Sequence, residues 1–158
     1  MKAGIIISSL LALSALTLSC ESDNAMAVLN QEEKIDKYIS ANFADYDVVR
    51  NGGSNRVILV YGSAVDTVAP GDSVTVMIDG YVFITSPSTQ FVSDSTTVVA
   101  GGGDLVDGLG NGLVGAGLGE ESYILFSAKY GYYKESVGAV PAMSALMFHT
   151  LVTQIKKK

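Results

Sequence analysis

Residues 100–119 read AGGGDLVDGLGNGLVGAGLG, and this stretch decides how the rest of the chain is interpreted. Nine of its twenty residues are glycine, yet aliphatic residues recur between them at intervals of three and four. Such intervals are typical of one face of a helix, and flexible linkers do not carry regularly spaced aliphatic side chains. We therefore predict a short helix near residues 105–114 that packs closely against a sheet, followed by a turn at residues 115–119.

The same stretch also satisfies a nucleotide-binding pattern. Gly110, Gly112 and Gly115 fit G-x-G-x-x-G, in which glycines let the backbone approach a pyrophosphate at the N-terminus of a helix. That site needs a strand directly before the glycines and a helix directly after them. Here the strand-like residues 120–126, EESYILF, follow the glycines instead. Because the order is wrong for a dinucleotide site, we favour the structural interpretation.

Strand-like segments lie on both sides of the predicted helix. Residues 47–50 and 56–62 predict a hairpin, because Asn51-Gly52 supplies residue types that tolerate positive φ in a tight turn. Alternating or β-branched sequence predicts four further strands. These strands cover residues 72–83, 95–100, 121–128 and 145–155.

A second helix is predicted on the N-terminal side of the strands. Ile35, Ile39 and Phe43 form one helical stripe near residues 31–43, and Asn30 stands before the helix as in a capping box. We expect this stripe to dock on the main domain. Antiparallel strands with one short central helix and one N-terminal helix place the chain in the α+β class.

The first twenty residues have the features of an export signal with a lipid attachment site. Lys2 precedes a short apolar run and the small Ser19, so residues 1–19 are predicted to be a signal peptide and not a membrane span. Cys20 resembles the acylated cysteine of a bacterial lipobox, although Thr17 stands where that motif usually has leucine. Ordinary signal cleavage beside an unmodified cysteine is the alternative.

Composition argues against several classes of function. Removing the signal takes away one charged residue, Lys2, so the net charge falls from −6 to −7 and nucleic acid is not expected as a partner. One cysteine cannot form an intramolecular disulfide, and one histidine, His149, argues against a zinc site or a Ser-His-Asp triad. Strand alternation directs His149 outward. Asp104 and Asp107 are interpreted as the solvated side of the short helix and not as a catalytic pair.

Three segments, in this order, resemble an FKBP-type peptidyl-prolyl isomerase domain. Residues 71–83, GDSVTVMIDGYVF, resemble the family's opening strand. Residues 104–126, DLVDGLGNGLVGAGLGEESYILF, resemble its central helix and the following strand without a gap. Residues 130–148, YGYYKESVGAVPAMSALMF, resemble its closing segment. The resemblance implies an FKBP-like domain over residues 70–158, with a curved antiparallel β-sheet and a short central helix.

The chain then divides into four predicted parts. They are a lipoprotein signal peptide (1–19), a tether (20–29), an N-terminal helix and hairpin extension (30–69) and the FKBP-like domain (70–158). We expect a monomer that is exported and lipid-anchored through Cys20. Its predicted place is the periplasmic or outer-membrane face of a membrane in a Gram-negative-type bacterium.

The resemblance implies an activity that needs neither a cofactor nor a covalent intermediate. A water-poor apolar pocket would bind the proline ring and favour the twisted amide of an X-Pro bond, while a hydroxyl group donates to the substrate carbonyl. The implied catalytic residues are Tyr132, Phe148 and Phe91. The implied substrate-binding residues are Leu105, Val106, Leu109, Ile78, Val140 and Tyr130. Tyr130, which precedes Gly131, competes with Tyr132 for the position of the family's tyrosine.

Four positions depart from the family's pattern. They are Leu109 for a tryptophan, Ile78 for a first-strand tyrosine, Val92 for an aspartate and Thr96 for a further aromatic residue. These departures leave two functions open. Either the chain is an isomerase that acts on proline-containing segments of exported proteins, or it is a catalytically weak or inactive peptide-binding and chaperone module. A structural component of a surface assembly is a third, less specific alternative.

Overall fold

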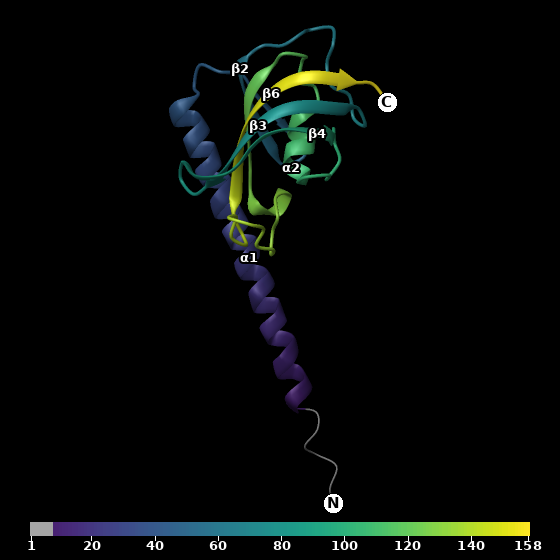
Figure 1. Ribbon diagram of the computed structural model, residues 1–158. Coiled ribbons are helices and arrows are strands. Elements are labelled where there is room, and N and C mark those ends of the chain that lie inside the picture. The colour runs from purple at the N-terminus through teal and green to yellow at the C-terminus, as the bar shows by residue number, and fades with distance from the viewer. Residues whose placement is uncertain (1–7) are drawn as a thin grey trace, which may run out of the picture.

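The computed structural model describes the backbone of residues 8–158 and the side chains from Cys20 onward (Figure 1). Residues 1–7 of the predicted signal peptide lie outside the described residues, as do the side chains of residues 8–19. The elements in chain order are α1 (Ser8–Asn42), β1 (Val48–Asn51), β2 (Ser54–Val60), β3 (Ser73–Phe83), β4 (Pro87–Val99), α2 (Asp107–Leu113), β5 (Glu121–Phe126), the 3-10 turn η1 (Ala128–Tyr130) and β6 (Ala145–Lys156).

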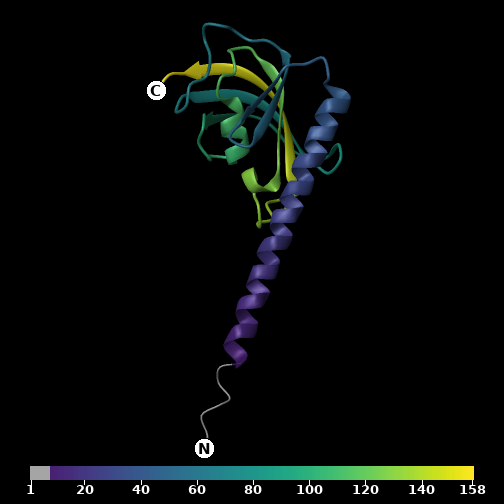
Figure 2. The ribbon, with the colours of Figure 1, turned by 180° about the vertical axis from the view of Figure 1, so that it is seen from behind.

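Within the described residues, six antiparallel strands form one sheet in the order β1-β2-β5-β6-β3-β4. The sheet curves around α2, and α1 runs along its opposite side (Figures 1 and 2). The strand β2 of the predicted extension pairs with β5, so the extension belongs to the same sheet as the later strands. The predicted architecture, an antiparallel curved sheet with a short central helix and an N-terminal helix, is confirmed.

Alternation along the strands separates two apolar cores. Ile124 and Phe126 of β5 point to the side of α2, which we call the inner face, and belong to the same cluster as Leu109 of α2. Leu125 points to the side of α1, which we call the outer face, and belongs to the same cluster as Ile35 of α1. The period of two along each strand therefore supplies both cores.

Two glycines let α2 lie close to the inner face. A Cβ at Gly108 would lie 2.3 Å from the Phe126 ring, and a Cβ at Gly112 would lie 2.4 Å from Cγ2 of Ile124. Carbon atoms of packed side chains stay about 3.5–4.0 Å apart, so any larger residue would push the helix off the sheet. The glycine-rich stretch is a packed helix as predicted, although its helical part, Asp107–Leu113, is shorter than 105–114.

A buried arginine of β2 forms an ion pair with the residue before β5 and hydrogen bonds with the end of α2. Nε of Arg56 lies 3.1 Å from Oε1 of Glu120, and the exposed fractions of the two side chains are 3% and 4%. Nη1 of Arg56 donates to the carbonyl oxygens of Gly112 at 3.0 Å and Val114 at 2.9 Å. Burial lowers the pKa of the Arg56 guanidinium, and the charge of Glu120 opposes that shift. The cation thus satisfies carbonyl groups that end a helix, where positive charge is favoured.

The N-terminal helix docks on the outer face as predicted, but its predicted start is wrong. Ile35 and Ile39 are buried, and the ring of Tyr38 meets that of Phe83 edge to face at 5.2 Å. The helix begins at Ser8 and continues through the predicted tether, residues 20–29, to Asn42. Five of the ten tether residues, among them Ala25 and Ala27, are good helix formers and none is glycine or proline, so the helix does not need to begin at Asn30.

Two details of the strands also differ from the sequence-based predictions. The β1–β2 turn places positive φ at Gly52 and Gly53, and not at the Asn-Gly pair. The predicted short strand at residues 95–100 is the second half of β4, which begins at Pro87. Because β4 is an edge strand with one side open to solvent, its polar first half remains compatible with pairing.

Candidate functional site

An apolar hollow of about 220 Å³ opens between β4, the segment before α2 and the loop that joins η1 to β6. Its lining residues are Phe91, Val92, Leu105, Tyr132, Val137, Gly138 and Ala139. None of these side chains is charged. The structure thus brings together three residues that the sequence predicted for the site, namely Phe91, Leu105 and Tyr132.

Aromatic rings form the support beneath this hollow. The Phe91 ring meets that of Phe148 edge to face at 5.6 Å, and Phe148 stacks on Phe126 at 5.9 Å. Phe148 is fully buried, so it supports Phe91 from below and does not line the hollow. A Cβ at Gly80 of β3 would lie within 2.8 Å of Val92, Phe91 and Phe148, so only glycine admits this arrangement.

Tyr132 supplies the polar group of the hollow. Its ring packs against the inner core cluster, and burial raises the pKa of its hydroxyl group. Within the described part of the chain, this hydroxyl has no hydrogen-bond partner. A phenol that stays protonated and unpaired is available to donate to a bound carbonyl group.

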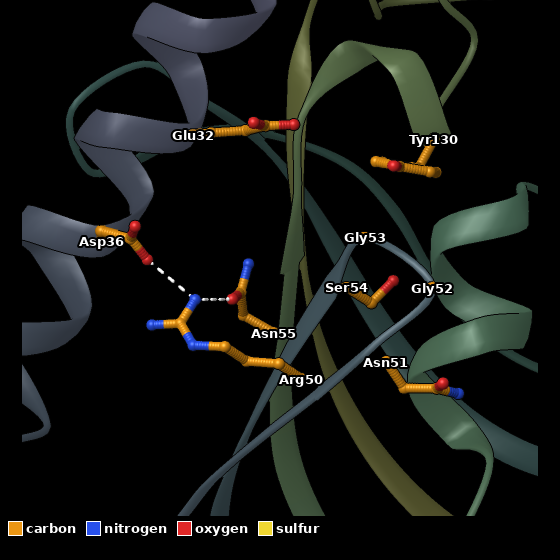
Figure 3. A pocket seen from close by; sticks show the side chains of 9 residues that line it. All are labelled: Glu32, Asp36, Arg50, Asn51, Gly52, Gly53, Ser54, Asn55 and Tyr130. Carbon is orange, nitrogen blue, oxygen red and sulfur yellow. Dashed lines mark hydrogen bonds and ion pairs between the residues drawn. The ribbon is translucent and has the colours of Figure 1, made fainter.

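Tyr130 faces a different part of the molecule. It lines a polar hollow of about 370 Å³ with residues of α1 and of the β1–β2 hairpin (Figure 3). Its ring lies against Gly53, where a Cβ would approach it to 2.0 Å. Arg50 in the same hollow is paired with Asp36 at 2.8 Å and contacts Asn55 (Figure 3). Geometry therefore places Tyr132, and not Tyr130, beside Phe91.

The remaining predicted substrate-binding residues are not among those that line the hollow. Val106, Leu109, Ile78 and Val140 are each buried in the inner core cluster. Val106 stands directly before α2, and Leu109 is inside that helix. Because these side chains are buried, contact with a bound molecule would require them to be uncovered.

Sequence reasoning missed one wall of the hollow. Val137 and Val140 exchange two backbone hydrogen bonds of 3.0 and 2.9 Å, and Gly138 between them has a φ of 56°. The intervening residues Gly138 and Ala139 line the hollow. The pattern Val-Gly-Ala-Val, a glycine turn between two β-branched residues, could have indicated this small hairpin.

Other candidate chemistry is absent from the hollow. Asp104 precedes α2 and accepts a hydrogen bond from the Val99 N–H at 2.9 Å, which is a structural role. His149 lies on the outer face, as alternation predicts, and contacts Glu121 at 2.7 Å. From Cys20 onward, no group of three His, Cys, Asp or Glu side chains could hold a metal ion.

Comparisons with known proteins give the fold and the family of this chain. A family model described as FKBP-type peptidyl-prolyl cis-trans isomerase matches residues 65–152. The crystal structure of the 3 FKBP domains of wheat FKBP73 is similar, with a TM-score of 0.64 and 18% sequence identity. That similarity covers 72% of this chain and 52% of the wheat chain, so this chain spans about half of the wheat protein's length. No curated protein sequence matches the chain. At this identity, the likeness to the wheat structure shows the fold alone.

Proposed function

The chain belongs to the FKBP-type peptidyl-prolyl cis-trans isomerase family, and on this premise we propose that it catalyses isomerisation of X-Pro bonds in exported proteins. One observation carries the proposal: Phe91, Leu105 and Tyr132 meet in one apolar hollow, and the hydroxyl of Tyr132 has no partner within the described residues. The matched residues 65–152 include all three.

The proposed mechanism follows from the chemistry of the peptide bond. Rotation about the bond removes amide resonance and meets a barrier of about 18–20 kcal/mol. The proline ring would lie against Phe91 and Leu105, where the apolar surroundings favour the less polar twisted amide. The hydroxyl of Tyr132 would donate to the carbonyl oxygen and hold it as the bond turns. Neither step needs a cofactor or a covalent intermediate.

An isomerisation assay on the full chain with Leu-Pro and Phe-Pro peptides tests the proposal. We expect Tyr132→Phe to lower kcat/KM about tenfold, the effect of one lost hydrogen bond of about 1.4 kcal/mol in the transition state. Tyr130→Phe is the matched control, because its ring lies in the other hollow, and it should keep the activity. Equal losses in the two variants would contradict the role of Tyr132.

Phe91→Ala is the second informative variant. Phe91 lines the hollow and is partly exposed, whereas Phe148 is fully buried and its removal would damage the core. We expect Phe91→Ala to raise KM for both peptides while circular dichroism shows an unchanged fold. A folded wild-type protein that gives no acceleration would refute the enzymatic proposal.

A peptide-binding module is the second candidate, and the uncharged lining favours it. Val92 lines the hollow where the family pattern has an aspartate, and Leu109 replaces the family's tryptophan inside the core. Such a hollow retains shape but has fewer groups that distinguish the twisted amide from the planar one. Binding of proline peptides at Tyr132, detected by NMR without any acceleration of isomerisation, would favour this candidate.

We also propose that Cys20 carries a lipid anchor and that the protein is exported. The supporting observations are the signal-like sequence before Cys20 and the exposed free thiol, which is part of α1. In the part of the structure that is described, no helix is long and apolar enough to cross a membrane. Fatty-acid labelling that is present in the wild type and lost in Cys20→Ala would support the anchor.

The proposed location is the periplasmic or outer-membrane face of a membrane in a Gram-negative-type bacterium. There the protein would act as a monomer on proline-containing segments of exported proteins. Fractionation of cells that express the wild type and Cys20→Ala tests the location. Labelling that persists in Cys20→Ala, or wild-type protein that remains in the cytoplasmic fraction, would contradict it.

A further inference from the structure

Two polar side chains, Gln31 and Glu32, interrupt the face with which α1 docks on the sheet, and Glu32 accepts a hydrogen bond from Oγ of Ser127 at 3.2 Å. Ile35 and Ile39 of this face are buried, and Gln31 lies one helical turn before Ile35. Nε2 of Gln31 donates to the carbonyl oxygen of Met143 at 2.7 Å, and its Oε1 accepts from the N–H of Ala128 at 2.8 Å. One carboxamide therefore joins α1 to the first residue of η1 and to the last part of the loop between η1 and β6.

These two hydrogen bonds belong to a closed ring of four. The carbonyl of Ala128 accepts from the N–H of Tyr133 at 3.1 Å, and the carbonyl of Tyr133 accepts from the N–H of Met143 at 2.6 Å. Gln31 closes the ring because it bonds the other backbone group of both Ala128 and Met143. Tyr132, which lines the apolar hollow, directly precedes Tyr133 within the loop that this ring holds.

The ring supports a backbone conformation that is unfavourable by itself. Tyr133 and Met143 have φ values of 51° and 57°, in the left-handed region that residues other than glycine rarely adopt. Such conformations persist where surrounding contacts fix them. Both residues are members of the ring, and Ala128 is fully buried, so its N–H would have no water to replace Gln31.

We propose that Gln31 is a positioning residue for the hollow, acting through the loop that carries Tyr132. The helix α1 lies outside residues 65–152, yet it sets the conformation of a tyrosine inside them. The expected effect on isomerisation rests on the proposed function of the hollow. The expected effect on the loop itself does not.

Hydrogen exchange on the full chain, followed residue by residue by NMR, tests the effect on the loop. Gln31→Met keeps the length of the side chain and removes both hydrogen bonds. We expect exchange at the amides of Tyr133 and Met143 to become about three- to tenfold faster, the effect of one or two net hydrogen bonds, while Phe148 in the middle of the sheet stays unchanged.

Two further variants sharpen the exchange experiment. Gln31→Glu keeps an acceptor for Ala128 but cannot donate to Met143 at neutral pH, so Met143 should show the larger effect. Glu33→Gln is the control, because Glu33 is on the exposed side of α1 and pairs with Lys37. Unchanged exchange in Gln31→Met, or equal acceleration at Phe148, would overturn the positioning role.

Isomerase activity tests whether Gln31 acts on the hollow through Tyr132. We expect Gln31→Met to lower kcat/KM about three- to tenfold in the wild-type background and to have no further effect in Tyr132→Phe, because both changes act on the same hydroxyl group. Additive losses would overturn the link. If the wild type has no isomerase activity, the proposed function fails while the exchange experiment still decides the role of Gln31.

Discussion

Arg50 and Arg56 lie on the two strands of one hairpin and experience opposite environments. Arg56 is 3% exposed under the inner face and pairs with Glu120, which is 4% exposed. Arg50 is 58% exposed beside α1 and pairs with Asp36, which is 55% exposed. Water competes for the outer pair and does not reach the inner one. The same two charges can therefore be essential on one side of a sheet and replaceable on the other.

The largest expected effect is at Arg56. Arg56→Met would leave the carboxylate of Glu120 buried without its cation and remove the donor for Gly112 and Val114. We expect the free energy of unfolding to fall by about 3–5 kcal/mol, measured by urea denaturation. Glu120→Gln in the same background should recover part of the loss. A fall below about 1 kcal/mol would refute the contrast with Arg50.

Truncating a buried aliphatic side chain of α1 should lower the free energy of unfolding nearly as much as the change at Arg56. Ile35 is fully buried, so Ile35→Ala removes apolar contacts and leaves a cavity. We expect a loss of about 2–5 kcal/mol in thermal or urea unfolding. Lys34→Ala on the exposed side is the control and should change stability by less than about 0.5 kcal/mol. Equal values for the two would mean that α1 does not dock in solution.

The close contact of α2 with the inner face predicts a smaller but specific loss. Gly108→Ala places a methyl group against the Phe126 ring, and overpacking of this kind costs about 1–3 kcal/mol. Phe126→Leu frees space at the same point. We therefore expect the double variant to be more stable than the sum of the two single losses, as a double-mutant cycle would show. If the two losses of stability simply added, the destabilisation by Gly108→Ala would not come from contact with the Phe126 ring.

Asp72 is an intermediate case, because a buried carboxylate meets an exposed lysine. It accepts from the Ala69 N–H at 2.8 Å, the Lys158 N–H at 3.1 Å and Nζ of Lys157 at 3.2 Å. The hydrogen bond from the Ala69 N–H is the main reason why the pKa of Asp72 lies below its usual value of 3.8. A carboxyl group whose pKa falls on folding stabilises the protein above its unfolded pKa, and this stability is lost as pH falls through the folded pKa.

We therefore expect Asp72→Asn to lower the melting temperature at neutral pH. The difference from the wild type should shrink as pH falls below about 4, where the carboxyl group becomes protonated in the unfolded wild type, and should vanish once the folded state is protonated as well. Calorimetry between neutral and acidic pH measures it. A difference that grows on acidification would have the wrong sign and would refute the assignment.

The smallest expected effect is at Arg50. Arg50→Met removes an exposed ion pair with Asp36, which is worth about 0–1 kcal/mol. Adding salt should shrink the difference in stability between the wild type and Arg50→Met, because exposed pairs are screened. A loss as large as that of Arg56→Met would erase the distinction between the two faces.

Sequence predicted the parts of this molecule that depend on local pattern. The aliphatic spacing near α2 and the period of two in β3, β5 and β6 give each element its face, because these patterns act within one element. The positions of the loop residues could not be predicted in this way, because a loop has no repeating pattern. Tyr130 and Tyr132 differ by two positions, and only the three-dimensional path of the loop separates their hollows.

Contacts between distant residues account for most of what sequence did not reveal. Gln31 is a polar residue one helical turn before the apolar stripe, and its partners Ala128 and Met143 come about a hundred residues later. Arg56 is a second example, because no sequence pattern near Arg56 predicts that its partner is Glu120. Such pairs have no period and no motif, so they become visible only when the chain is folded.

The position of β6 constrains the order in which this chain can fold. This last strand of the sheet lies between β5 and β3, and among the strands of residues 8–158 it alone joins β1-β2-β5 to β3-β4. Before β6 has been synthesised, the nascent chain can form only the two separate parts of the sheet, which have unpaired edges and an incomplete core. Pairing between distant segments is slow, because chain entropy is lost before contacts form. Because the sheet cannot be completed early, the chain would stay unfolded for longer and could pass through a translocation channel. This behaviour suits a protein that is proposed to be exported before it folds.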